Sequence, residues 1–193
     1  MTIWHWVRHG PTHEKAFVGW RDVPADLSDT AAIARLSAQL PDEALMISSD
    51  LKRCVATADA LSARGRKRLA HDPQLREFNF GDWDGMVFNE VAARDPALSR
   101  AYWENPGDVR APNGESWNDA ATRVNAVVDA MNAAHPEAHI IAVAHFGVIL
   151  TQVQRARGQT PYEALGQKIE PLSLTRLTFE RGRWAEEIVN HNP

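Results

Sequence analysis

Hydrophobic residues follow two patterns along the chain, short continuous runs and longer segments with helical spacing. Short apolar runs predict buried strands, and apolar residues three or four positions apart predict helices. Strands are therefore expected at 2–7, 44–48, 139–144, 172–179 and 184–189, the last two as a hairpin. Helices are expected at 28–40, from a cap at Ser49 or Asp50 onward, at 88–94, 96–104, 115–134 and 147–157.

Strands alternate with helices over most of the chain, which favours an α/β fold with a mostly parallel sheet and helices on both faces. A length of 193 residues suits a single domain spanning 1–193. The segment 78–114 is rich in glycine and turn signals, and it is a candidate small cap over a functional site.

Composition narrows the possible classes of partner. The formal net charge is −4, so the basic surface typical of nucleic-acid binding is absent. We find neither a signal peptide nor an apolar run of transmembrane length, and so expect no membrane association. The single cysteine, Cys54, cannot form an internal disulfide, which fits a cytoplasmic protein. The oligomeric state is left open.

Two histidines occur in similar settings. His9 lies in Val7-Arg8-His9-Gly10, and His145 lies in Val143-Ala144-His145-Phe146-Gly147. Each follows an apolar strand and has a glycine close behind. Because ligands bind at the carboxyl ends of strands in α/β sheets, both histidines are expected in one crevice. The helix that follows His145 would add backbone N–H groups for an anion.

Two arginines complete a predicted phosphate cradle. Arg53 falls in the first turn of its helix, where a cation opposes the helix dipole unless an anion lies between them. Arg8 adjoins His9, and its guanidinium matches phosphate oxygens in a bidentate way. Arg8, His9, Arg53 and His145 could together bind a phosphoryl group, with neutral His9 as the nucleophile.

A proton donor for the leaving oxygen is also needed. Glu77 is the best candidate because flanking aromatic residues would desolvate it and raise its pKa. Asp82 and Asp84, in the same segment, compete for this role.

Other chemistries lack their motifs. The chain has no P-loop and no dinucleotide fingerprint. Cys54 has no arginine six residues on and fits a helix core, and His13-Glu14 lacks the second histidine of a zinc protease. No cysteine–histidine cluster suggests a metal, so neither metal nor cofactor is expected.

The ordered set of motifs resembles the histidine phosphatase (phosphoglycerate mutase-like) superfamily over nearly the whole chain. The similar segments are Arg8-His9-Gly10-Pro11-Thr12, 48–58, 75–85, Gly114-Glu115-Ser116 and 143–147. The resemblance implies a three-layer α/β/α sandwich, a metal-independent reaction, His9 as phosphorylated nucleophile and Glu77 as proton donor. It also implies that Arg8, Arg53 and His145 hold the phosphate. We expect Gly10, Thr12 and Phe146 to be further substrate contacts.

Departures from the motifs favour the phosphatase branch. The stretch 17–24 is similar to the mutase branch, but Pro11 stands where that branch has glutamate, and Glu14-Lys15 stand where it has Trp-Asn. The chain is also too short for the long, basic cap insertion of the cofactor-dependent mutases. We predict a phosphomonoester hydrolase acting on a small phosphorylated metabolite and releasing inorganic phosphate. The alternatives are a phosphoglycerate mutase-type transferase and a non-catalytic module that binds a phospho-ligand.

Overall fold

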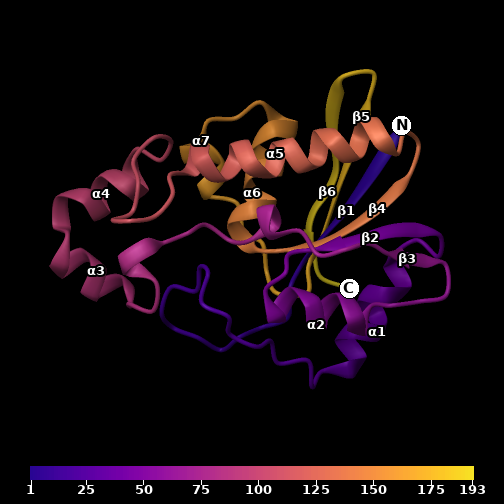
Figure 1. Cartoon of the computed structure of the whole chain (residues 1–193), viewed down its shortest axis with the longest axis horizontal. Helices are drawn as coiled ribbons and strands as arrows, with labels where there is room; N and C mark the ends of the chain where they lie inside the picture. The colour runs from indigo at the N-terminus through magenta and orange to yellow at the C-terminus, as the bar shows by residue number, and fades with distance from the viewer.

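The computed structural model describes all 193 residues and arranges them as one sheet with helices on both sides (Figure 1). The six strands are β1 (Thr2–Arg8), β2 (Ala44–Ser48), β3 (Arg66–Arg68), β4 (His139–Ala144), β5 (Leu174–Glu180) and β6 (Arg183–His191). The seven α-helices are α1 (Thr30–Gln39), α2 (Lys52–Ala60), α3 (Phe88–Arg94), α4 (Pro96–Glu104), α5 (Trp117–Ala134), α6 (Phe146–Arg157) and α7 (Pro161–Leu165). Two short 3-10 turns, η1 (Pro73–Leu75) and η2 (Gly81–Trp83), lie between β3 and α3.

The sheet consists of a parallel block and an antiparallel hairpin. Its strand order is β3-β2-β4-β1-β5-β6. The first four strands in this order are parallel, whereas β5 runs against β1 and β6 runs against β5. The predicted α/β fold and the terminal hairpin are confirmed, and the sheet is mixed at its β5–β6 edge. Central strands that are covered on both faces consist mainly of apolar residues, as in β4, where every residue after His139 is apolar.

Side chains of the central strands alternate between two hydrophobic layers, because successive strand residues point to opposite faces. On β4, Ile140 packs with α5 and α6, whereas Ile141 packs with α1 and α2. Trp4 and Trp6 of β1 both belong to the α5–α6 layer and stack with ring centroids 5.1 Å apart. The three-layer sandwich that the resemblance implied is therefore confirmed (Figure 1).

Helices α3 and α4 extend away from the sandwich at one end of the molecule (Figure 1). They occupy the residues expected for the two short helices. A separate hydrophobic cluster forms their interior, built on Trp83, Val91, Tyr102 and Ala111. Trp83 is fixed further by a 2.8 Å hydrogen bond from its indole Nε1 to Asp95. The segment 78–114 thus has packed contacts of its own beside the sheet.

The predicted start of α1 is wrong by two residues. The helix begins at Thr30, and its N-cap is Asp29. The Asp29 carboxylate accepts a 2.9 Å hydrogen bond from the backbone N–H of Ala32. This bond satisfies one of the free N–H groups of the first turn.

The predicted caps of α2 are also wrong. Leu51 is the N-cap, and no side chain caps the helix. The carboxylate of Asp50 instead accepts two hydrogen bonds from Arg76, of 2.7 and 2.6 Å. A bidentate, charge-assisted pair with a distant arginine therefore replaces a local cap. The short elements β3 and α7 were not predicted, because so few residues show no periodicity. No helix combines the length and apolar character needed to cross a bilayer.

Candidate active site

His9 and His145 lie side by side at one edge of the sheet. They follow β1 and β4, which are parallel neighbours with Arg8 paired to Ala144. The backbone N–H of His9 donates to the carbonyl of Ala144 at 3.0 Å. The two imidazole centroids are 5.1 Å apart. The structure thus brings together the two histidines that the sequence placed at strand ends.

The imidazole of His9 is held in one tautomer. Its Nδ1 lies 2.7 Å from the carbonyl oxygen of Gly10, which can only accept, so Nδ1 carries the proton and Nε2 keeps its lone pair. Burial, together with the charge of Arg53, lowers the pKa of His9 to about 3. The ring is therefore neutral near pH 7, with an unprotonated nitrogen available for attack.

Gly10, whose carbonyl accepts the hydrogen bond from His9, is itself held by α2. Its N–H donates to Oγ1 of Thr57 at 3.0 Å. A Cβ at this position would lie 2.5 Å from Cδ2 of Leu27, so glycine permits the close approach of these segments. Gly10 does not line the pocket beside His9, and the structure does not place it at the substrate position suggested by the sequence.

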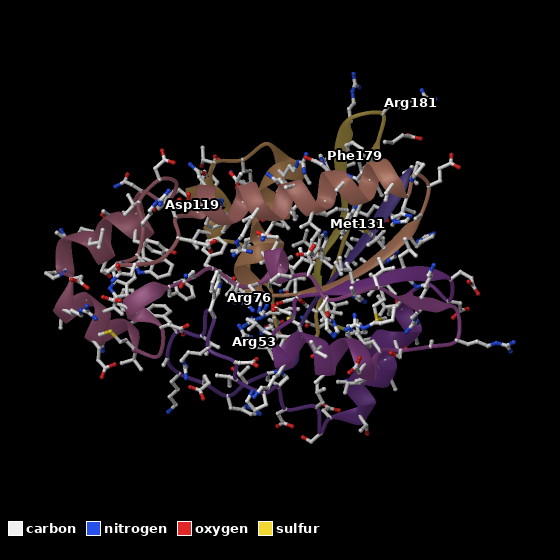
Figure 2. All side chains as sticks on the ribbon, viewed as in Figure 1. Arg53, Arg76, Asp119, Met131, Phe179 and Arg181 are labelled. Carbon is white, nitrogen blue, oxygen red and sulfur yellow. The ribbon has the colours of Figure 1, made fainter.

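Arg53 is buried in the first turn of α2 and is fixed by three hydrogen bonds. Its Nε donates to Nε2 of His9 at 3.2 Å. Its two terminal nitrogens donate to the carbonyls of Arg21, at 2.9 Å, and Gly19, at 2.7 Å. Figure 2 shows Arg53, a residue of α2, near the middle of the molecule. A cation is thus held beside His9 by backbone carbonyls of a distant loop.

Arg8 supplies a second cation beside His9. One terminal nitrogen donates to the carbonyl of Ile169 at 2.6 Å, and its guanidinium lies 5.5 Å from the centre of the Phe146 ring. Its Nε is buried and has no protein partner. Buried donors without a partner destabilise a fold, so an anion that reached this nitrogen would be bound favourably.

Glu77 is buried and lies in the same pocket wall as Arg8 and His9. Its carboxylate accepts hydrogen bonds from the backbone N–H groups of Phe78, at 3.0 Å, and Gly147, at 3.1 Å. Burial raises the pKa of Glu77, and those hydrogen bonds oppose the rise. A raised pKa suits a general acid. The sequence predicted backbone N–H groups for an anion at the start of α6. The N–H of Gly147 at this helix start donates to the Glu77 carboxylate.

The two competing carboxylates hold loops in place. Asp82 is exposed and pairs with Arg94 at 3.0 Å. Asp84 accepts hydrogen bonds from the backbone N–H groups of Gly19, at 3.1 Å, and Arg21, at 3.0 Å, and pairs with the Arg21 side chain. Neither Asp82 nor Asp84 lines the pocket, whereas Glu77 does.

His145 is fully buried and contacts Cys54, a residue that the sequence assigned to the core. The thiol Sγ lies 3.3 Å from Nε2 of His145. Burial lowers the pKa of His145 and raises the pKa of Cys54, so both groups are neutral. Cys54 does belong to the hydrophobic cluster under α2, and it also orients His145.

A pocket of about 250 Å³ opens beside His9 and extends toward α4. Arg8, His9 and Glu77 lie in its wall, together with Thr12 and Phe146. Thr12 and Phe146, the two expected contact residues, therefore line the same pocket as His9. Arg53 and His145 lie behind His9 and do not line the pocket.

An ion pair that the sequence did not reveal supports Glu77. Arg123 of α5 donates to the backbone carbonyls of Arg76, at 2.8 Å, and Glu77, at 2.9 Å. It also pairs with Glu115 at 2.8 Å. Helical spacing gave no signal for this role, because Arg123 is about 46 residues away from the loop it holds.

A family model described as "Histidine phosphatase superfamily (branch 1)" matches residues 5–192. Phosphoglycerate mutase-like protein 4 of Arabidopsis thaliana is 29% identical, over 94% of this chain and 82% of its own. Glucosyl-3-phosphoglycerate phosphatase of Mycolicibacterium vanbaalenii is 34% identical, over 74% of this chain and 68% of its own. A solved mycobacterial glucosyl-3-phosphoglycerate phosphatase in complex with VO3 is 25% identical and superposes with a TM-score of 0.85, over 97% of this chain and 98% of that one.

Proposed function

The chain belongs to the histidine phosphatase superfamily and is a phosphoric monoester hydrolase, and from this premise we propose that His9 carries the phosphoryl group during hydrolysis. The observation that carries the proposal is the state of His9. Its Nδ1 proton is directed to the Gly10 carbonyl, and its Nε2 lone pair faces Arg53. A neutral imidazole beside two arginines suits attack on a phosphate dianion.

In the first step, Nε2 of His9 attacks phosphorus and the bond from phosphorus to the leaving oxygen breaks. Glu77 gives its proton to that oxygen, and the alcohol departs. Arg8 and Arg53 stabilise the charge on the equatorial oxygens, which is the main requirement of phosphoryl transfer. The buried and unpartnered Nε of Arg8 supports its part in this cradle. His145, 5.1 Å from His9 between centroids, is proposed as a further phosphate ligand.

In the second step, the Glu77 carboxylate removes a proton from water, and the oxygen attacks phosphorus. The bond from phosphorus to Nε2 breaks, its electron pair returns to His9, and inorganic phosphate leaves. The residues thus end in their starting protonation states. The proposal needs neither metal nor cofactor, and the chain has no group of three or more potential metal ligands.

The substrate is proposed to be a small phosphorylated metabolite, with residues 78–114 acting as a cap. Support for the cap comes from α4, whose Tyr102 and Trp103 line the pocket. Thr12 and Phe146 are proposed as substrate contacts on the same ground. We also propose a cytoplasmic location, since the one cysteine is a buried thiol, and no role for nucleic acid or membrane.

A mutase-type transferase is the second candidate, and the mutase-like name of the Arabidopsis relative favours it. The two reactions differ in the fate of the phosphoryl group. A mutase returns it to a second hydroxyl of the substrate, whereas a phosphatase passes it to water. With phosphoglycerates, isomer that forms faster than inorganic phosphate would establish the mutase.

The test of the proposed function is a metabolite phosphatase panel run with wild type and His9→Ala. We expect phosphate release and acid-labile labelling of the wild-type protein by a ³²P-labelled substrate, and neither from the variant. No activity of the wild type above the variant across the panel would make the chain a module that binds a phospho-ligand. Labelling that persists in His9→Ala would remove His9 from the nucleophilic role.

A further inference from the structure

The pocket wall beyond the phosphate cradle is mainly apolar and lacks a cation. Apart from Arg8 and His9, the ionisable side chains that line the pocket are two carboxylates, Glu14 and Glu77, and the phenol of Tyr102. An anionic group on the leaving alcohol would therefore lose its hydration without gaining an ion pair. Glu14 is itself paired with Arg21 at 3.3 Å, so it does not call for a cationic ligand.

Aromatic rings form one continuous wall from the proton donor to α4. Phe78, next to Glu77, lies 6.5 Å from Phe80 between ring centroids. Phe80 lies 5.2 Å from Phe17, and Phe17 stacks on Trp103 at 5.7 Å. A wall of this kind favours an elongated apolar body, because each ring removes apolar surface from water.

Two polar atoms without partners lie at the α4 end of this wall. The hydroxyl of Tyr102 and the indole Nε1 of Trp103 are both buried and have no hydrogen-bond partner in the protein. The two rings are in contact, with centroids 4.8 Å apart, and both residues line the pocket. Burial raises the pKa of Tyr102, so its hydroxyl stays a neutral donor. Buried donors without partners are uncommon and call for an acceptor.

We propose that the substrate is the phosphate ester of an uncharged, elongated and mainly apolar alcohol that carries a hydrogen-bond acceptor, such as a carbonyl oxygen, remote from the phosphate. The acceptor meets Tyr102 and Trp103, while the apolar body lies along the aromatic wall. This inference rests on the proposed function of His9 and gives that site its substrate class. It makes α4 the element that selects the substrate.

The test begins with two esters whose leaving alcohols have nearly equal acidity. 4-Phenylbutyl phosphate and 4-(4-acetylphenyl)butyl phosphate differ only in the remote acetyl group, which carries the carbonyl acceptor. 3-Phosphoglycerate and phosphocholine add an anionic and a cationic leaving group. For wild type we expect kcat/KM to be about tenfold higher for the acetyl ester than for its parent, since a hydrogen bond to an otherwise unpaired buried donor is discriminating. Both charged esters should be slower than 4-phenylbutyl phosphate.

Variants identify the residues that donate hydrogen bonds to the remote acceptor of the substrate. Tyr102→Phe and Trp103→Phe should each lower the ratio between the acetyl ester and its parent, and the double variant should bring it to about one. Tyr102→Phe removes a hydroxyl that has no protein partner, so its fold should be unaffected. Tyr162→Phe is the matched control, because this second tyrosine is 61% exposed and lies outside the pocket. It should keep the wild-type ratio.

Charged esters that react as fast as 4-phenylbutyl phosphate would overturn the uncharged, apolar substrate class. A wild-type ratio of one, or a ratio that survives in the double variant, would overturn recognition of the acceptor. Failure of the proposed function has a different signature, namely no acid-labile labelling of His9 by any ester. In that case calorimetry can still measure binding in the pocket, with the phosphonate analogues of 4-phenylbutyl phosphate and its acetyl derivative. Equal Kd values for the two analogues would reject the inference.

Discussion

Nε of Arg53 donates a hydrogen bond to Nε2 of His9 across 3.2 Å, on the nitrogen that is proposed to attack phosphorus. The lone pair of His9 is thus aimed at the guanidinium before any phosphate arrives. An incoming phosphoryl group must take the place of this contact, and the same N–H can then donate to a phosphate oxygen. The contact therefore orients His9, and the same N–H can stabilise charge on a bound phosphoryl group.

Arg53→Lys is expected to lower kcat/KM by about 100-fold or more, the size of effect seen when one stabilising donor is removed. An ammonium cannot bond Gly19, Arg21 and His9 in fixed directions at once. Steady-state kinetics with p-nitrophenyl phosphate measures the loss. Arg181→Lys is the control, since Arg181 lies at the β5–β6 turn, far from Arg53 (Figure 2). Activity of Arg53→Lys within a fewfold of wild type would show that the fixed directions of the guanidinium N–H groups are not needed.

Glu77→Gln is expected to slow an alkyl phosphate by about 100-fold or more and p-nitrophenyl phosphate far less. An alkoxide needs its proton as it leaves, whereas p-nitrophenolate does not. The amide oxygen can still accept from Gly147 and Phe78, so the loop should keep its shape. Single-turnover rates of alcohol release provide the measurement. Equal slowing for both esters would remove Glu77 from the role of acid.

The rate of alcohol release from an alkyl phosphate should fall as the pH rises through the pKa of Glu77. Burial raises this pKa, so the protonated donor persists to a higher pH than in an exposed glutamate, and it is lost above that value. The rate of p-nitrophenol release should not fall in this pH range. We expect no such fall in the rate of alcohol release by Glu77→Gln. The same fall in the variant would assign the titration to another group.

Asp84→Asn is expected to lower kcat/KM about tenfold, because Asp84 holds the loop whose carbonyls fix Arg53. An amide has one acceptor oxygen and turns its NH2 toward the N–H donors of Gly19 or Arg21. Since the acid is intact, alkyl and p-nitrophenyl esters should slow equally, unlike in Glu77→Gln. Asp82→Asn is the matched control, as it removes an exposed pair with Arg94. A larger effect of Asp82→Asn than of Asp84→Asn would contradict this assignment.

The stability of the fold should depend on pH through His5, which lies 3.0 Å from Nδ1 of His139. Burial, aided by His139, lowers the pKa of His5 to about 3, so the unfolded chain binds the proton first. The contribution is full above about pH 6.5 and is lost as the pH falls toward 3. The slope contributed by His5 is at most about 1.4 kcal/mol per pH unit.

Urea unfolding of wild type and His5→Gln between pH 4 and pH 7 measures this contribution. The variant should show a shallower rise of unfolding free energy with pH. His135→Gln, which changes a partly exposed histidine, should keep the wild-type slope. Parallel curves for wild type and His5→Gln would mean that His5 is not the group that titrates.

Much of the fold follows from local patterns. The runs at 44–48 and 139–144 are the strands β2 and β4, and the helical spacings at 88–94 and 96–104 are α3 and α4. Such elements depend on periodicity within a short window, which the sequence displays directly. Local reasoning was wrong at the start of α2, where Asp50 binds Arg76 rather than the helix N-terminus. A partner 26 positions away leaves no trace in that window.

The sequence by itself determined that two histidines follow apolar strands, that Arg53 stands in a first helical turn, and that Glu77 lies among aromatic residues. Only the tertiary structure decided the tautomer of His9, the burial of Glu77 in the pocket wall, and the unpaired donors on α4. The physical reason is that strand and helix patterns are properties of neighbouring residues. Burial, pKa and hydrogen-bond partners arise from segments that meet only when the chain is packed.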